Sequence, residues 1–128
     1  ACTISQAAML QACRDPLPDE VARRRRSFDE RRRFLVDAVR ALPGARITPP
    51  KGAFYALIDL REVCEKRGLA DLAVCRQLLD RHHLALVPGS AFGAPGFVRA
   101  SYAAPMDRLE EAVRRLAAWL TQEPVAGR

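Results

Sequence analysis

The chain has 128 residues, 49% of them hydrophobic and 28% charged, a balance typical of one globular domain and not of a disordered segment. The net charge of +6 is divided equally between residues 1–44 and residues 45–128, so no basic arm indicates a nucleic-acid partner. The apolar runs are far shorter than the ~18 residues of a membrane span, and no cationic start followed by an apolar stretch indicates a signal peptide. We therefore expect a cytoplasmic protein that binds neither nucleic acid nor membrane.

The cysteines and histidines do not follow the spacing of a metal site. No two cysteines form a CxxC pair, and His82 and His83 are the only histidines, so a zinc site would need an irregular set of ligands. Two of the cysteines, Cys2 and Cys13, would lie roughly 16 Å apart along a helix, too far for a disulfide. We expect small, buried, reduced thiols at all four positions, Cys2, Cys13, Cys64 and Cys75.

Two helices are predicted in the first third of the chain. Thr3 and Gln6 have the spacing of a capping box and begin a short helix, which residues 15–18 end because their two prolines cannot donate helical hydrogen bonds. A second helix is predicted over residues 18–42, where apolar side chains recur every seven residues and indicate a face packed on a core. This stripe consists of Val21, Phe28, Leu35 and Leu42.

Four consecutive arginines, residues 23–26, lie within the second predicted helix. Because neighbours on a helix are ~100° apart, their guanidinium groups point around most of its circumference and make no single patch. Acidic residues three or four positions away are close enough for ion pairs. We interpret this segment as a solvated, ion-paired helix face and not as a nucleic-acid site.

Three strands are predicted in the remainder of the chain. Residues 53–60 and 84–87 are short apolar runs bounded by turn residues, which is typical of buried strands. Residues 97–102 form a strand with two unlike faces, because Val98, Ala100 and Tyr102 point one way and the residues between them point the other.

Helices are predicted between and after these strands. Residues 61–67 form one helical turn or two, ended by Gly68, and a further helix begins near Asp71 and closes around residues 81–83. Its apolar stripe consists of Leu69, Leu72, Cys75, Leu78 and Leu79. The last helix begins at Asp107, and its stripe consists of Leu109, Ala112, Val113, Leu116 and Leu120.

This order of elements predicts the fold class. It is an α/β, two-layer sandwich in which helices cover one face of a small, mainly antiparallel sheet. The last two strands are joined by a loop too short for a crossover, so we expect that pair to be antiparallel.

Arg99 is the candidate site residue. In the middle of the third strand it shares a face with Phe97 and Ser101, so it has lost much of its water and needs an anion. The pattern leaves two interpretations open. One is an internal salt bridge to Asp59 or another acid, and the other is bidentate capture of a ligand carboxylate or phosphate.

Two other segments resemble known functional motifs but do not match them. The loop of residues 88–96 has its serine between glycines, but without the GxSxG spacing of a serine hydrolase or the lysine of a phosphate-binding loop. Its glycines predict tight turns near a ligand or partner. Residues 51–55 begin like an RNA-recognition signature, but Ala53 and Phe54 do not fit it.

Four blocks of the sequence form a recognisable series. They are residues 50–55 (PKGAFY), 86–93 (LVPGSAFG), 98–103 (VRASYA) and 109–116 (LEEAVRRL). In their order and approximate spacing they resemble the carboxy-terminal part of the pyridoxal-phosphate-dependent class I/II aminotransferases. Residues 5–8 and 31–35 also resemble the part of the family that lies after its cofactor-lysine segment. The resemblance therefore extends from residue 1 to about residue 121.

The resemblance implies an aspartate-aminotransferase-like enzyme of fold type I, in which a large domain holds pyridoxal phosphate and a small domain closes over an amino acid or 2-oxo acid. Residues 1–44 would be the helical segment that connects to the large domain, and residues 45–128 the small, substrate-closing domain. Arg99 matches the family's arginine that grips the α-carboxylate of the substrate. The resemblance also implies a homodimer.

The family's Schiff-base lysine has no counterpart in this chain. Its two lysines, Lys51 and Lys66, lie outside the family's Ser-x-Ser-Lys type of segment, and we expect both to be solvated. We therefore expect a small domain without the remainder of its enzyme, inactive alone, with no catalytic or cofactor-binding residue of its own. Two alternatives stay open, a lyase or synthase of the same fold and a stand-alone regulatory module that binds amino acids.

Overall fold

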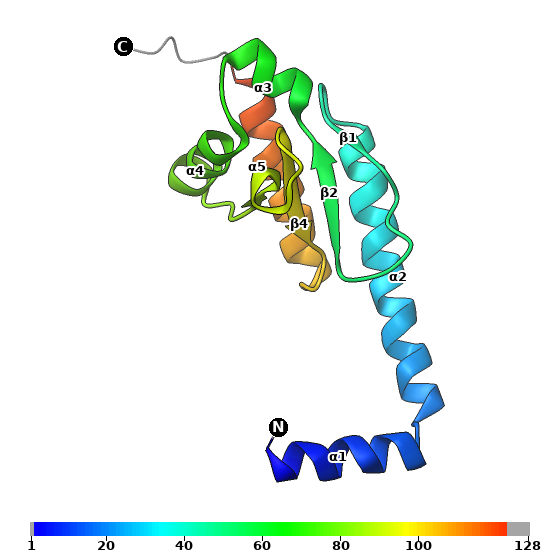
Figure 1. Ribbon diagram of the computed structural model, residues 1–128. Coiled ribbons are helices and arrows are strands. Elements are labelled where there is room, and N and C mark those ends of the chain that lie inside the picture. Colours follow the sequence, from blue (N-terminus) through cyan, green and yellow to red (C-terminus); the bar gives the residue numbers. More distant parts are fainter. Residues whose placement is uncertain (1, 123–128) are drawn as a thin grey trace.

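The computed structural model describes residues 2–122, which form a two-layer α/β sandwich with one helix outside it (Figure 1). In chain order the elements are α1 (Thr3–Arg14), α2 (Pro18–Arg40), β1 (Arg46–Ile47), β2 (Tyr55–Asp59), α3 (Arg61–Arg67), α4 (Asp71–His82), β3 (Val87–Pro88), the 3-10 helix η1 (Gly89–Phe92), β4 (Phe97–Ser101) and α5 (Met106–Thr121). The predicted fold class is confirmed.

The sheet has the strand order β1-β2-β4-β3, and every neighbouring pair is antiparallel. The central strands β2 and β4 pair along their whole length, with Leu57 opposite Arg99. The outer strands are two residues long. Because side chains alternate along a strand, Ala56, Ile58 and Val98 point into the core, and the residues between them lie on the opposite face.

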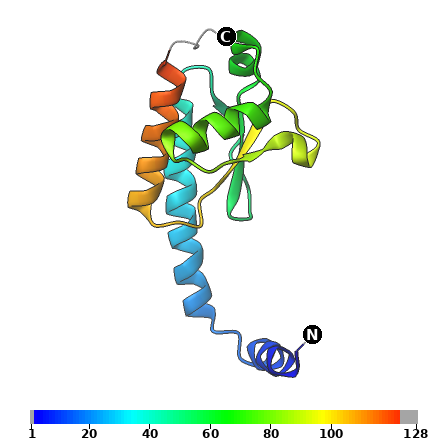
Figure 2. The same cartoon turned by 90° about the vertical axis from the view of Figure 1, so that its left-hand side faces the viewer.

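Helices α2, α4 and α5 cover the core face of this sheet (Figures 1 and 2). Each contributes apolar side chains at spacings of three or four residues, as a helix that packs along one stripe must. Their most buried members are Leu35 and Val39 of α2, Val74 and Leu78 of α4, and Leu116 and Trp119 of α5. The indole N–H of Trp119 donates to Gln77 Oε1 at 3.2 Å, so the largest buried side chain keeps its polar atom satisfied.

Helix α1 lies outside the sandwich and is joined to the amino end of α2 (Figures 1 and 2). None of its residues is buried, and Ile4 and Met9 are exposed on its surface. The predicted helix is confirmed, but the predicted cap is wrong, because the residue before the helix is Cys2 and no side chain caps it. Among the described residues, no helix has the length and apolar character needed to cross a membrane.

Two strand predictions need correction. Residues 84–87 were expected as a strand, but pairing begins only at Val87. The reason is the end of α4, where His83 adopts a left-handed backbone with φ +51° and the N–H of Leu84 bonds back to Leu78 O at 3.0 Å. Strand β1 was missed, since its two residues are too few to give an alternating pattern.

The predicted apolar stripes hold only in part. Leu72 and Leu79, expected on the buried side of α4, are about half exposed, whereas Asp71 of the same helix is buried. Strand β2, expected to be wholly buried, has Leu57 on its open face at 38% exposure. These errors have the same cause. The sequence shows which side chains share a face, but not how much of that face the neighbouring elements cover.

The cysteines divide into two classes. Cys64 and Cys75 are buried as predicted, but Cys2 and Cys13 are exposed, which contradicts the expectation for them. Burial and the nearby carboxylate of Asp71 raise the pKa of both buried thiols, that of Cys75 to about 11.

We predict that a thiol reagent such as dithiobis(nitrobenzoate) at pH 8 labels Cys2 and Cys13 at once and Cys64 and Cys75 only after denaturant is added. The reason is that the reactive thiolate of the buried pair is both shielded and disfavoured. Peptide mass spectrometry of the labelled chain locates the modified residues. Equal labelling of all four thiols in the folded chain would contradict the burial of the α3–α4 pair.

A single arginine closes the carboxyl end of α5. Arg67 Nη2 donates to the carbonyl oxygens of Trp119, Leu120 and Gln122 at 3.0, 2.9 and 2.8 Å. Its guanidinium carbon also lies 4.2 Å from the centroid of a Trp119 ring. These carbonyls have no partner within the helix, so Arg67 ties α3 to the end of α5.

We predict that Arg67→Ala lowers the free energy of unfolding by about 1–3 kcal/mol, because it removes charge-assisted hydrogen bonds and the contact with Trp119. Arg76→Ala, which removes an exposed arginine of α4, is the control and should change stability by less than ~0.5 kcal/mol. Urea titration followed by Trp119 fluorescence measures both. Equal stability of the two variants would show that the cap contributes nothing.

Candidate functional site

Arg99 lies on the open face of the sheet, between two aromatic rings. Its guanidinium carbon is 4.4 Å from the ring centroid of Phe92 in η1 and 5.1 Å from that of Tyr55 in β2. Both rings lie within cation–π distance of the guanidinium and stabilise its charge. Within residues 2–122 no carboxylate forms an ion pair with Arg99, so its hydrogen-bonding edge has no anionic partner in this chain.

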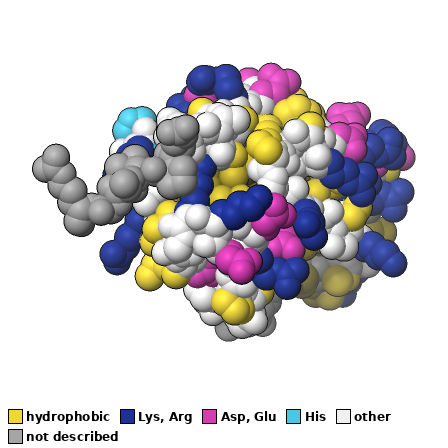
Figure 3. Space-filling model, turned by 90° about the horizontal axis from the view of Figure 1, so that it is seen from above, with side chains coloured by type: hydrophobic (Ala, Val, Ile, Leu, Met, Phe, Trp, Pro, Cys, Tyr) yellow, Lys and Arg dark blue, Asp and Glu magenta, His cyan; other side chains and the backbone are white. Residues whose placement is uncertain are grey.

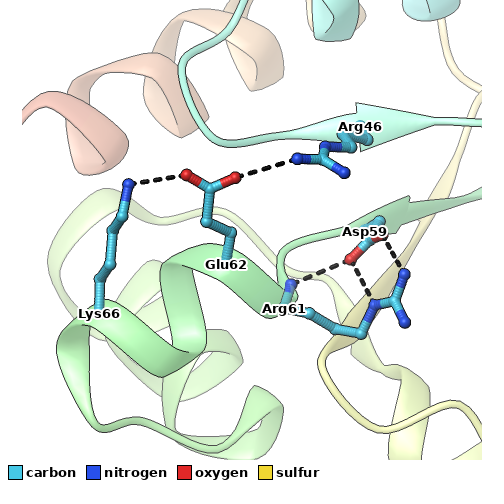
Figure 4. Close-up of polar contacts among 5 residues, drawn as sticks. All are labelled: Arg46, Asp59, Arg61, Glu62 and Lys66. Carbon is cyan, nitrogen blue, oxygen red and sulfur yellow. Dashed lines mark hydrogen bonds and ion pairs between the residues drawn. The ribbon is translucent and has the colours of Figure 1, made fainter.

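Asp59, the internal partner considered for Arg99, is held by Arg61 (Figure 4). Arg61 Nε and Nη2 donate to Asp59 Oδ1 and Oδ2 at 3.0 and 2.8 Å, and the backbone N–H of Arg61 donates to Oδ1 at 3.0 Å. Arg61 also stacks over Phe97, with 5.0 Å between its guanidinium carbon and the ring centroid. The interpretation of Arg99 as a salt-bridge partner of Asp59 is therefore wrong.

A second ion-pair group lies next to this one. Glu62 accepts hydrogen bonds from Lys66 Nζ at 2.7 Å and from Arg46 Nη2 at 3.2 Å (Figure 4). These contacts lower the pKa of Glu62, first through the hydrogen bond from Lys66. Lys66 is exposed, as predicted, and is engaged with a carboxylate.

The loop before β2 is fixed by Tyr102, the residue that follows β4. The buried hydroxyl of Tyr102 donates to the carbonyls of Gly52 and Ala53 at 3.2 and 3.0 Å, and its backbone N–H donates to Phe54 O at 2.8 Å. Ala53 has a φ of +63°, a left-handed conformation that non-glycine residues seldom adopt. The far end of β4 therefore sets where the aromatic pair Phe54 and Tyr55 lies relative to Arg99.

An open groove of about 550 Å³ crosses the same face of the sheet next to Arg99. Its walls are residues 46–50 on one side and the outward side chains of β2 on the other, with Leu57 directly opposite Arg99 in the strand register. Arg99 does not line the groove itself, but Phe97 of the same strand does. The exposed apolar side chains of this face are Phe54, Tyr55, Leu57 and Phe92.

The arginine run of α2 is ion-paired only in part. Arg23 and Arg24 both bind Glu20 at 2.7 Å, as the predicted spacing requires. These hydrogen bonds lower the pKa of Glu20 to about 2. On the surface seen in Figure 3, basic and acidic side chains are interspersed.

Arg25 and Arg26, in contrast, line a common hollow of about 380 Å³ with Arg32 and Lys51. Arg23 and Arg24 do not line this hollow, so the four guanidinium groups do not gather into one patch, as predicted. Arg25, Phe28, Asp29 and Arg32 have the spacing of one helix face, and the loop of residues 51–53 folds against that face. Lys51 is exposed and lies in this hollow and not in the groove beside Arg99.

The arrangement around Arg99 suits the capture of an anion. A guanidinium presents parallel N–H donors that match the two oxygens of a carboxylate, and two aromatic rings lie beside this one. Partial burial strengthens each hydrogen bond that the fork makes. The open apolar surface beside it provides space for the rest of a small ligand.

Comparison with known proteins agrees with this fold. The sequence model of the family described as aminotransferase class I and II matches residues 1–116. The probable aspartate/prephenate aminotransferase of Aquifex aeolicus is 41% identical over 115 residues, which are 89% of this chain and 29% of that protein. The aspartate aminotransferase of Bacillus sp. (strain YM-2) is 37% identical over the same shares of the two chains.

Solved structures give the same result. The crystal structure of the aspartate aminotransferase from Rhizobium meliloti superposes with a TM-score of 0.81 at 38% identity, over 90% of this chain and 30% of that one. Aspartate aminotransferase from Thermus thermophilus with maleate gives a TM-score of 0.78 at 33% identity, over 91% and 29%. These matches define an aminotransferase fold. The chain belongs to the class I and II aminotransferases, and it spans less than a third of the length of the curated relatives it matches.

Pyridoxal phosphate, the cofactor that this family implies, does not fit the described residues on their own. Its chemistry needs a lysine to form the Schiff base. Lys66 is bound to Glu62, and Lys51 lies in the hollow beside α2, so neither shares the face of Arg99. Among residues 2–122, no lysine therefore lies beside Arg99 to form a Schiff base.

Sequence reasoning singled out Arg99 as a candidate but did not predict the rings beside it. Tyr55 and Arg99 lie on one face of the sheet because of the register in which β2 pairs with β4. The sequence does not give this register, so it could not predict that the two residues are neighbours. Phe92 lies in the loop of glycines, whose path depends on tertiary contacts. A signal was nevertheless present in the sequence, since the glycine-rich loop precedes the strand of Arg99 by only a few residues.

We predict that the carboxyl of Asp59 titrates below its usual value of 3.8, because hydrogen bonds from Arg61 lower its pKa. A lowered pKa in the folded chain contributes stability that is present above the unfolded-state value and is lost as the pH falls through the folded value. In Arg61→Ala the pKa of Asp59 should return toward 3.8, and the stability difference from the unsubstituted chain should shrink in acid. Carbon-13 NMR of the Asp59 carboxyl carbon measures the titration, and an unchanged midpoint would contradict the pairing.

Proposed function

We propose that this chain is the substrate-closing small domain of an aminotransferase that exchanges an amino group between an amino acid and a 2-oxo acid. In this proposal Arg99 binds the α-carboxylate of the substrate. The observation that carries it is a guanidinium held between Phe92 and Tyr55 with no carboxylate partner within residues 2–122. A cation kept half-buried in this way is stabilised when a ligand supplies the anion.

The role of Arg99 is orientation. Two parallel hydrogen bonds from the fork would fix the carboxylate plane and with it the direction of the bonds at the substrate α-carbon. Holding a reacting bond in one direction lowers the entropic part of the barrier to its cleavage. The exposed rings of Phe54 and Tyr55 would at the same time exclude water from one side of the substrate.

We further propose that the substrates include dicarboxylic acids. The support is that relatives of this chain are named aspartate aminotransferases and that the Thermus thermophilus enzyme was solved with maleate, which is itself a dicarboxylate. Arg99 would bind one carboxylate of such a substrate. Arg46 and Arg61, at the groove on the same face, already have carboxylate partners, so we assign the second carboxylate to groups outside residues 2–122.

The remaining parts of the proposal concern the rest of the enzyme. Pyridoxal phosphate would be held by a large domain, to which residues 1–44 connect, and residues 45–128 would close over the substrate. The exposed apolar side chains of α1, among them Ile4, Met9 and Leu10, support a contact with further protein. We also propose a homodimeric enzyme in the cytoplasm, where the four free thiols of this chain would stay reduced.

A chimeric enzyme tests this proposal. The part of the Rhizobium meliloti aspartate aminotransferase that this chain matches is replaced by the chain, and amino exchange between L-aspartate and 2-oxoglutarate is measured. We predict that the chimera is active and that Arg99→Ala lowers kcat/KM by about 10²-fold or more, because two charge-assisted hydrogen bonds of ~1.5–3 kcal/mol each are lost. Arg99→Lys should restore only part of the activity, because an ammonium lacks the bidentate fork.

Arg108→Ala is the matched control, since it removes the same charge from an exposed position on α5 and should leave kcat/KM within about twofold. Equal kinetics for the Arg99 and Arg108 variants would overturn the anchor. Release of ammonia in place of a new amino acid would favour a lyase of the same fold. Submillimolar binding of aspartate to the 128-residue chain alone would favour a regulatory module.

A further inference from the structure

The sandwich contains one buried charged residue among those described, Asp71 at the first turn of α4, which is 4% exposed. Its carboxylate has no basic partner within residues 2–122. Oδ2 accepts a hydrogen bond of 2.6 Å from the backbone N–H of Ser90, and Oδ1 accepts one of 2.9 Å from the N–H of Leu72. Burying a carboxylate costs free energy unless its oxygens accept hydrogen bonds. The bond from Ser90 therefore fixes the positions of Asp71 and Ser90 relative to each other.

The bond to Ser90 fixes the start of η1, nineteen positions away in the chain. This short helix begins at Gly89, which packs so tightly that an added Cβ would lie 2.3 Å from Ala94 O and 2.7 Å from Phe97 O. The N–H of Ala94 bonds back to Gly89 O at 3.0 Å. The turn is thus anchored on β4 through Gly89 and on α4 through Asp71.

The same turn carries Phe92, whose ring lies against the guanidinium of Arg99. Asp71 therefore reaches the candidate site in two steps: its carboxylate holds Ser90, and the turn that starts there presents Phe92 to Arg99. Neither α4 nor Asp71 contacts Arg99 through any described hydrogen bond or ion pair. The arrangement predicts that loss of the carboxylate releases the ring before it disturbs the sheet.

We infer that Asp71 is a positioning residue for the substrate anchor, which acts by fixing the turn of residues 89–92 so that Phe92 holds the fork of Arg99 in plane. Its role in substrate binding rests on the proposed function, whereas the linkage from Asp71 to Arg99 stands on the contacts of this chain alone. The prediction for the enzyme is a defect in the carboxylate binding and substrate orientation that Arg99 provides.

Nitrogen-15 NMR of the 128-residue chain tests the linkage. The Nε–Hε signal of Arg99 senses the ring current of Phe92, so Phe92→Ala defines the shift that loss of the ring produces. We expect Asp71→Ala to move the signal in the same direction and to speed hydrogen exchange of the Ser90 amide about tenfold or more. Asp107→Ala is the control, because it removes an exposed acid from the first turn of α5, and it should leave both readouts unchanged.

Ser90→Pro is a second variant that removes the donor and keeps the buried carboxylate. Proline suits the backbone of a 3-10 turn, so the variant should fold and should shift the Arg99 signal as Asp71→Ala does. If either variant folds with the native spectrum of α4 and α5 and leaves the Arg99 signal in place, the inference is overturned. If Asp71→Ala does not fold, Ser90→Pro decides the question.

The chimeric enzyme provides the functional readout. There Asp71→Ala should lower kcat/KM for aspartate about tenfold, and it should have little further effect when Arg99→Ala is also present, a dependence that general loss of structure would not produce. An equal fall in kcat/KM with and without Arg99 would contradict the positioning role. If the unsubstituted chimera lacks activity, the proposed function fails, and the NMR comparison still decides whether Asp71 holds Arg99 through the turn.

Discussion

The arrangement of the open face depends on one cation that the chain does not neutralise. Arg99 is half-buried and lies between Phe92 and Tyr55, and none of the described acidic side chains pairs with it. Folding removes part of the water around this cation, and within residues 2–122 no acidic side chain takes its place. The neighbouring acid Asp59 is unavailable because Arg61 binds it with two side-chain hydrogen bonds and one from the backbone.

This division of partners follows from chain geometry. Asp59 ends β2 and Arg61 begins α3, so the two side chains meet at a corner that the backbone itself makes. Arg99 lies across the sheet, opposite Leu57 and two register positions from Asp59. Because of this corner, Arg61 binds the Asp59 carboxylate. The guanidinium of Arg99, in the middle of β4, therefore has aromatic neighbours but no acidic partner among the described residues.

Much of this fold could be predicted from periodicity. Helix α2 follows from apolar residues that recur every seven positions, and the unlike faces of β4 follow from the alternation of side chains along a strand. Gly68 marks the end of α3 because glycine readily adopts the left-handed backbone found there. The predictions that failed depended on contacts between distant segments. The start of β3 is delayed by the left-handed His83, and the exposure of Leu72 depends on how the sheet meets α4. The candidate site divides in the same way, since Arg99 was evident from its strand and its ring partners were not.

The outer strands β1 and β3 are too short to pair well with a strand from another molecule. β1 and β3 each present only two residues, and β3 includes Pro88, whose nitrogen has no hydrogen to donate. A strand from another molecule could form too few backbone hydrogen bonds with either edge strand to extend the sheet. The longer strands β2 and β4 lie in the centre, where they are already paired on both sides. The short outer strands thus protect the sheet against edge-to-edge growth into fibrils.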